Sequence, residues 1–257
     1  MKKRERIDLT LILIWPIIAS LISISLKVNL IISVLIFYFI PSLLLSLRIK
    51  KEIKKAALFS FLSIPVYIAL ETLGTISNIW TINTIFQFKI FGSTIEGILW
   101  DFFAFYFAIM FYEYFLDKHI TKKLYNPHLK YLLILVLSLF SVFLFTYLGF
   151  PYLLNINYAY LIIGIIFIFV PILLEIFTYN KLIKKFLFVS AYFFYFNFIY
   201  EITALKLSWW SFPVNGQFIG WISILGINFP FEELFFFILL GIAAALSFFE
   251  FFDDDNK

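Results

Sequence analysis

The chain contains no cysteine, and only 14% of its 257 residues are charged. The lack of cysteine excludes disulfides, thiolate nucleophiles and cysteine-ligated metal or iron–sulfur sites. The low charge accompanies 63% hydrophobic residues and a mean hydropathy of +0.99, which exclude a soluble domain and indicate a polytopic membrane protein. No Gly-x-Gly-x-x-Gly or Walker loop occurs, so no nucleotide-binding domain is expected. We predict that the protein works without a cofactor or a bound metal.

Eight apolar stretches are long enough to cross about 30 Å of hydrocarbon as helices, which takes roughly 17–25 residues each. Backbone groups in lipid must be hydrogen-bonded within the segment, so each stretch is predicted to be a helix. The predicted fold class is an all-α membrane protein with about eight transmembrane helices in the lipid bilayer. The predicted spans are 9–26, 28–47, 56–73, 93–116, 129–150, 156–176, 186–204 and 230–251.

The basic residues give these spans an orientation. Seventeen of the 20 Lys and Arg residues lie at the N-terminus, near 48–55, 118–130 and 181–185, and in the C-terminal tail. By the positive-inside rule we predict a multi-pass protein of the cell membrane with both termini cytoplasmic. This topology, and not a nucleic-acid partner, explains the net charge of +4. The charged start is followed by no small-residue cleavage site, so the first span is expected to be retained.

Several residues recur at a fixed offset of 130 positions. A common register without a gap predicts two tandem copies of one unit, 1–125 and 126–257. Each copy holds four spans, so both have the same orientation and are expected to be related by a pseudo-twofold axis along the membrane normal. The matched pairs are Glu71 with Glu201, Pro41 with Pro171, Lys54-Lys55 with Lys184-Lys185, and Trp80 with Trp210.

Five glutamates are predicted at one depth, near the outer face of the membrane. Glu71 and Glu201 fall near the outer ends of the third and seventh spans. Glu96, Glu232 and Glu233 open the fourth and eighth spans from the same side. An ionisable group in hydrocarbon costs roughly 2.5–3.5 kcal/mol even on lenient insertion scales, so by default it marks a function.

The head of the eighth span carries a motif. Pro230-Phe231-Glu232-Glu233 precedes Leu-Phe-Phe-Phe at the start of this span. The motif occurs in a small membrane protein whose sequence predicts an internal duplication. This combination resembles the lycopene cyclase domain of the heterodimeric or fused carotenoid cyclases of archaea, actinobacteria and fungi. The resemblance covers most of the chain and is strongest over 195–255.

The first copy departs from this motif. At the equivalent place it has Ser-Thr-Ile-Glu-Gly, so the proline is missing and only Glu96 remains. An alignment at offset 137 pairs Glu96 with Glu233, whereas offset 136 pairs it with Glu232. Both alternatives are open at this point. Asp101, one turn further along, would supply a second carboxyl group.

The resemblance implies a lycopene β-cyclase, which closes the linear ψ ends of lycopene and other linear carotenoids into β-ionone rings without net redox change. This chemistry requires a neutral carboxylic acid as proton donor and a weak base for the departing proton. Glu232 or Glu233 would donate, with Glu201, Glu71 and Glu96 as base or as members of the network. Aromatic faces would stabilise the passing cation, the candidates being Trp80, Trp209, Trp210, Phe235 and Phe236.

Other classes of function remain open. A proton-coupled transporter would also combine internal repeats with acids in the membrane, although here the midplane is almost without polar groups. A non-catalytic membrane scaffold would not need paired acids. An ε-, γ- or C50-cyclase, or a hydratase acting on the same cation, is a further alternative. The sequence leaves open whether there are one or two active sites, and the oligomeric state.

Overall fold

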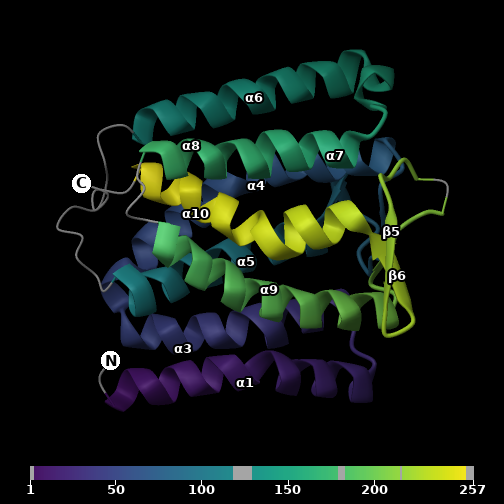
Figure 1. Ribbon diagram of the computed structural model, residues 1–257. Coiled ribbons are helices and arrows are strands. Elements are labelled where there is room, and N and C mark those ends of the chain that lie inside the picture. Colours follow the sequence, from purple (N-terminus) through teal and green to yellow (C-terminus); the bar gives the residue numbers. More distant parts are fainter. Residues whose placement is uncertain (1–2, 118–128, 179–182, 215, 253–257) are drawn as a thin grey trace.

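The computed structural model describes residues 3–117, 129–178, 183–214 and 216–252. The predicted boundary between the copies, at 125–126, lies outside these residues, as do the basic residues predicted within 118–128. The described chain is a bundle of helices that lie side by side, with short strands gathered at one end (Figure 1). The prediction of an all-α membrane protein is confirmed at the level of its class.

The helices of the first half begin with a long one and continue through two interrupted spans. They are α1 (Lys3–Leu26); α2 (Leu30–Val34), the π-helical turn η1 (Leu35–Phe39) and α3 (Ile40–Arg48); η2 (Lys50–Glu52) and α4 (Ile53–Ile76); and α5 (Ile95–Tyr112) with η3 (Glu113–Asp117). Two of them carry capping side chains. The Asn29 side chain accepts from Ile32 N before α2, and Thr94 Oγ1 accepts from Gly97 N before α5, so each satisfies an otherwise orphaned amide.

The second half has the same order of elements. They are α6 (Leu129–Gly149) with η4 (Pro151–Leu154); α7 (Ala159–Ile163), the π-helical η5 (Gly164–Phe169) and α8 (Val170–Thr178); α9 (Ile183–Lys206); and the π-helical η7 (Glu233–Leu240) leading into α10 (Gly241–Phe252). A π-helical turn interrupts the second span of each half, and η5 begins 129 positions after η1. Such turns are rare and are often found at functional sites.

Seven helices of the described chain are long and apolar enough to cross a membrane. The remaining predicted span, 129–150, contains the shorter apolar helix Leu133–Gly149. The seven are Lys3–Leu26, Leu30–Arg48, Lys50–Ile76, Ile95–Asp117, Ala159–Phe177, Ile183–Lys206 and Glu233–Glu250. The chain is therefore a multi-pass membrane protein by the length and composition of its helices.

The two ends of the bundle differ in structure. α1 begins and α10 ends at one end, here called the terminus end, while the strands lie at the opposite, strand end (Figure 1). All strand pairs are antiparallel: β1 with β4, β2 with β3, and β5 with β6. The strands are β1 (Thr81–Ile82), β2 (Lys89–Ile90), β3 (Ser93–Thr94), β4 (Trp210–Ser211), β5 (Trp221–Ile224) and β6 (Ile227–Pro230).

Two tight hairpins at the strand end lead the chain into α5 and η7. Phe91 and Gly92 join β2 to β3 with φ of 50° and 93°, and Leu225 and Gly226 join β5 to β6 with φ of 54° and 75°. Positive φ at both central residues is typical of two-residue hairpins, whose twist it matches. Each hairpin thus presents a short strand directly before the residue that opens a span.

The ends of α4 and α9 share one hydrogen-bonding pattern at the offset of 130. Ile79 N donates to Gly74 O at 2.8 Å, and Trp209 N donates to Ala204 O at 2.9 Å. Asn78 and Ser208 both have φ of 55°. This left-handed residue closes each helix and turns the chain toward the strands.

Residues 130 positions apart also meet directly at the strand end. Thr81 lies opposite Ser211 in the β1–β4 pair, and their side-chain oxygens are 2.8 Å apart. The long helices cross between the halves in the same way. α1 packs against α9, where Ser20 Oγ lies 2.7 Å from Thr203 Oγ1, and α6 packs against α4.

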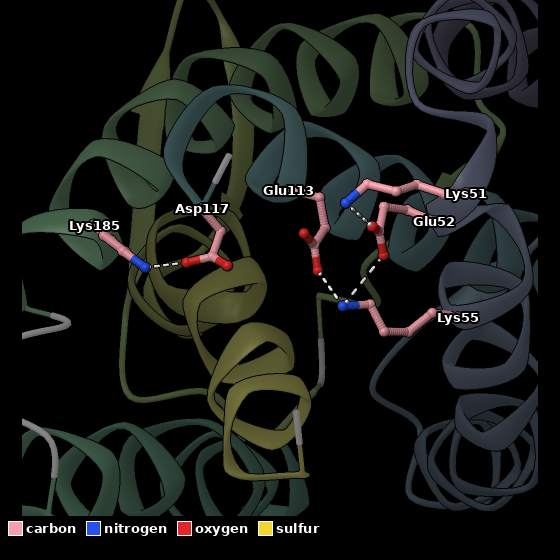
Figure 2. A network of polar contacts seen from close by, with 6 residues as sticks. All are labelled: Lys51, Glu52, Lys55, Glu113, Asp117 and Lys185. Carbon is pink, nitrogen blue, oxygen red and sulfur yellow. Dashed lines mark hydrogen bonds and ion pairs between the residues drawn. The ribbon is translucent and has the colours of Figure 1, made fainter. Parts of the chain in front are cut away.

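A buried charge network holds the terminus end together (Figure 2). Lys55, whose side chain is 2% exposed, lies 2.6 Å from Glu113 Oε1 and 3.3 Å from Glu52 Oε2. Lys185 forms an ion pair with Asp117 in the same region. Charges removed from water are tolerated when paired in this way.

The same two lysines contact aromatic rings of the opposite half. Lys55 Nζ lies 5.3 Å from the ring centroid of Phe249, and Lys185 Nζ lies 5.4 Å from that of Tyr112. Cation–π contacts within about 6 Å are attractive, more so when desolvated. The two contacts are reciprocal, because each half supplies one lysine and one ring.

Candidate functional site: a chamber lined by carboxyl groups

A cavity of about 370 Å³ lies between the two halves. In the first half its walls come from α2, η1, α4, β1 and α5. In the second half they come from α6, α7, η5, α9, β4, η7 and α10. Most of the lining is aliphatic or aromatic, with a few polar groups, as in pockets for small molecules. The four carboxyl residues that line it are Glu71, Asp101, Glu201 and Glu233.

Both carboxylate oxygens of Glu71 accept hydrogen bonds. Its residue is 1% exposed and lies near the end of α4. Thr94 donates to Oε1 through its backbone N at 3.0 Å and its hydroxyl at 2.8 Å, and the hydroxyl of Ser93 donates to Oε2. Three donors match the acceptor-only chemistry of a carboxylate.

Glu201 occupies the corresponding place on α9. It is 4% exposed, and its Oε1 accepts a hydrogen bond from the indole Nε1 of Trp210 at 2.9 Å. Trp80, the residue matched with Trp210, also lines the chamber. The structure therefore brings together both acids and both tryptophans that the 130-residue register singles out.

Glu233 differs from the other three carboxyl groups in its hydrogen bonding. It is the first residue of η7 and lines the chamber. Within the described part of the chain its side chain receives no hydrogen bond, in contrast to those of Glu71, Asp101 and Glu201. An unbonded carboxyl group in an apolar wall is suited to donating a proton to a bound molecule.

Glu232 and Glu96, unlike Glu233, accept hydrogen bonds from backbone N–H groups. Glu232 is fully buried and its Oε1 accepts from Ile219 N at 2.7 Å. Glu96 is fully buried as well, and its Oε1 accepts from Ile85 N at 2.7 Å and Phe86 N at 2.9 Å. Neither is among the residues that line the chamber. Both tie a loop of the strand end to the start of a helix.

This shared contact favours one of the two alignments of the first motif. Glu96 and Glu232 both accept hydrogen bonds from backbone N–H groups of a strand-end loop, so the two residues correspond to each other. This is the alignment at offset 136, in which the counterpart of Glu233 is Gly97. A Cβ at Gly97 would lie 2.1 Å from Tyr67 Oη and 2.8 Å from Glu71 Oε2. A side chain at this position would therefore require Tyr67 and Glu71 to move.

Removing the Glu96 carboxylate is expected to weaken the loop at the strand end. Glu96→Ala leaves two backbone N–H groups without their acceptor, and hydrogen bonds to charged groups contribute about 1.5–3 kcal/mol each to stability. Thermal unfolding of the purified protein in detergent measures the loss. Glu96→Gln, which keeps one acceptor oxygen, is the matched control and is expected to unfold closer to the unaltered protein. Equal stability of Glu96→Ala and the unaltered protein would contradict this role.

Asp101 supplies the second carboxyl group of the first half. It is 5% exposed, and its Oδ2 accepts from the Ser63 hydroxyl at 2.6 Å. It stands one turn beyond Gly97, so its carboxyl group reaches the same chamber from α5. In the sequence, Asp101 is recognisable as an acidic residue inside an apolar span.

Three of the aromatic candidates, Trp209, Phe235 and Phe236, do not line the chamber. Trp209 is buried and donates through Nε1 to Val28 O at 2.8 Å, fixing the α1–α2 connection. Phe236 packs onto Gly164, where a Cβ would come within 2.4 Å of its ring. Phe235 stacks on Phe231, with centroids 5.7 Å apart.

Other aromatic residues line the chamber in their place. Phe237 and Tyr160 stack with ring centroids 4.6 Å apart, and both belong to the wall. Tyr160 also makes an edge contact with Trp80 at 5.3 Å. Sequence reasoning missed Phe237 because a run of three phenylalanines does not reveal which one faces inward from a π-helical turn, and no sequence pattern singled out Tyr160.

Comparison with known proteins adds no relative. No protein-family model matches the chain, and no match is found among curated proteins or solved structures. In the described ranges, no three His, Asp or Glu residues are grouped as metal ligands would be.

Proposed function

We propose that this protein is a lycopene β-cyclase, which closes the ψ ends of lycopene into β-ionone rings. The observation that carries the proposal is Glu233, a carboxyl group without hydrogen-bond donors in the described chain, facing an apolar chamber with three anchored carboxyl groups. An acid and a base at separate points of one dry cavity are what a proton-in, proton-out cyclisation requires.

The reaction is balanced without a redox partner. Glu233 transfers its proton to C2 of the terminal C1=C2 double bond, which leaves a tertiary cation at C1. The electron pair of C5=C6 forms the C1–C6 bond, which moves the cation to C5. Loss of the proton from C6 restores the C5=C6 double bond inside the ring. Glu71, held as an acceptor by Ser93 and Thr94, is the proposed base.

The chamber walls suit a cationic intermediate. Trp80, Trp210, Tyr160 and Phe237 present ring faces or edges to the cavity. Faces of aromatic rings attract cations, most strongly in desolvated sites. An apolar lining also keeps out water, which would otherwise capture the cation as an alcohol and divert the product.

The shape of the chamber suits a long polyene. α10 and η7 contribute lining residues from Glu233 to Phe249, and α4 contributes them from Phe59 to Glu71. Phe59 and Glu71 are twelve positions apart on α4, a span of about 18 Å at 1.5 Å per residue. A rod-shaped substrate can lie along this wall with one end beside the carboxyl groups.

The duplication is part of the proposal. Thr81 opposite Ser211 at the strand end and the reciprocal Lys55–Phe249 and Lys185–Tyr112 contacts at the terminus end support a pseudo-twofold axis parallel to the helices. The offset is 136 between Glu96 and Glu232 and 137 between Tyr112 and Phe249. The π-helical η7, with its wider turns, accounts for the added residue. By the positive-inside rule, the basic residues near the terminus end support a cytoplasmic location for it.

Production in a lycopene-accumulating bacterium tests the function. We expect the red pigment to become yellow-orange, with γ-carotene and then β-carotene identified by chromatography. A different ring type in the product would redirect the proposal to an ε- or γ-cyclase. Unchanged lycopene in cells that hold the protein in their membranes would contradict the cyclase and leave the transporter to be tested by proton flux.

A further inference from the structure

The chamber has a counterpart in the other half that is filled with aromatic rings. The chamber separates α4 from η7 and α10; the equivalent elements are α9 and α5. Between these two, Phe107 packs against Phe193 and Phe196 with ring centroids 5.4 Å apart in each case. All three phenylalanines are at most 1% exposed. None of them lines the chamber.

The difference between the two sides follows from a few substitutions at matched positions. Ser63 and Val66 line the chamber, and the residues 130 positions later are Phe193 and Phe196. Ala244 also lines the chamber, and the residue 137 positions earlier is Phe107. Small side chains therefore leave the space open on one side, and phenylalanines occupy it on the other.

Carboxyl groups from both halves line the chamber. Glu71 and Asp101 come from the first half, and Glu201 and Glu233 from the second, yet all four line one cavity. Glu71 and Glu201, which occupy matched positions on α4 and α9, both line the chamber, so among the described residues this pair is not available to the filled side. A second site would need both an opening and its own acids.

We infer that the protein has a single reaction chamber in which the two ends of the linear substrate are cyclised one after the other. This inference rests on the proposed function. Because all four acids line this one cavity, a substrate with two identical ends must leave or turn between the steps. The one-ring product is then a free intermediate that the same residues process again.

Exchanging the matched side chains tests the inference. Ala244→Phe and, separately, Val66→Phe place on the chamber side the rings that fill the other side. Both variants are expected to lose one-ring and two-ring products together and to retain less lycopene on purification, measured by absorbance. Phe107→Ala is the matched control, and its turnover per folded molecule is expected to stay near that of the unaltered protein. Membrane levels and thermal unfolding establish that each variant folds.

Product ratios give a second readout that does not depend on filling the cavity. Glu71→Gln and Glu201→Gln, one from each half, are expected to slow both cyclisations, with the same ratio of one-ring to two-ring product at equal conversion. Accumulation of one-ring product in either variant would overturn the inference, as would full activity of Ala244→Phe and Val66→Phe. If instead the unaltered protein forms no ring, the proposed function itself fails and this inference fails with it.

Discussion

Glu233→Gln is expected to slow ring formation about 10²–10⁴-fold, the range that a positioned general acid contributes. The amide has nearly the shape of the carboxyl group but no acidic proton. Since Glu233 makes no hydrogen bond in the described chain, its replacement removes no hydrogen bond that holds the fold. Membrane levels are therefore expected to be unchanged. The rate of β-carotene formation by purified protein in lipid vesicles measures the effect.

The neighbouring glutamate provides the control for this experiment. Glu232→Gln keeps an oxygen that can accept from Ile219 N, and Glu232 does not line the chamber. Its activity is expected to stay within a few-fold of the unaltered protein. The proposed assignment is wrong if the two variants lose activity equally, or if Glu232→Gln is the inactive one.

Lys55→Met is expected to produce the largest loss of stability. Lys55 is 2% exposed and pairs with Glu113 and Glu52, whose side chains are 0% and 5% exposed. Removing one partner of a buried ion pair costs about 3–5 kcal/mol, because the remaining charge stays in the apolar interior. The temperature of thermal unfolding in detergent is expected to fall accordingly.

Lys51 is the matched control for Lys55. It also lies beside Glu52, at 3.2 Å, but its side chain is 54% exposed. Exposed ion pairs contribute about 0–1 kcal/mol, so Lys51→Met is expected to shift the unfolding temperature little. Similar shifts for the two variants would show that burial at the terminus end does not govern stability.

Much of the helical layout can be predicted from hydropathy alone. The third predicted span, 56–73, lies within α4 (Ile53–Ile76), and the seventh, 186–204, lies within α9 (Ile183–Lys206). Apolar length fixes such helices because lipid forces the backbone to bond within its own segment. The π-helical turns and the hairpins at the strand end depend on local hydrogen bonds and backbone torsions, which hydropathy does not record.

The sequence identifies part of the chamber lining, and the differences from the structure have one cause. Glu71 and Glu201 were found by their register, and both line the chamber. The sequence does not show which of Glu232 and Glu233 is the proton donor. Adjacent helical residues point about 100° apart, and only the folded structure shows which of the two faces the chamber. The same ambiguity led to Phe235 and Phe236, where Phe237 forms the wall.

The central claim is that a carboxyl group of the chamber adds a proton to C2 of the substrate and another group removes the proton from C6. Cyclisation of lycopene by purified protein in deuterated water tests this claim most directly. The account predicts a carotenoid that has gained one deuterium, at C2, for each ring formed. Rings that contain no solvent deuterium at C2, or lycopene that is bound but never closed, would contradict it.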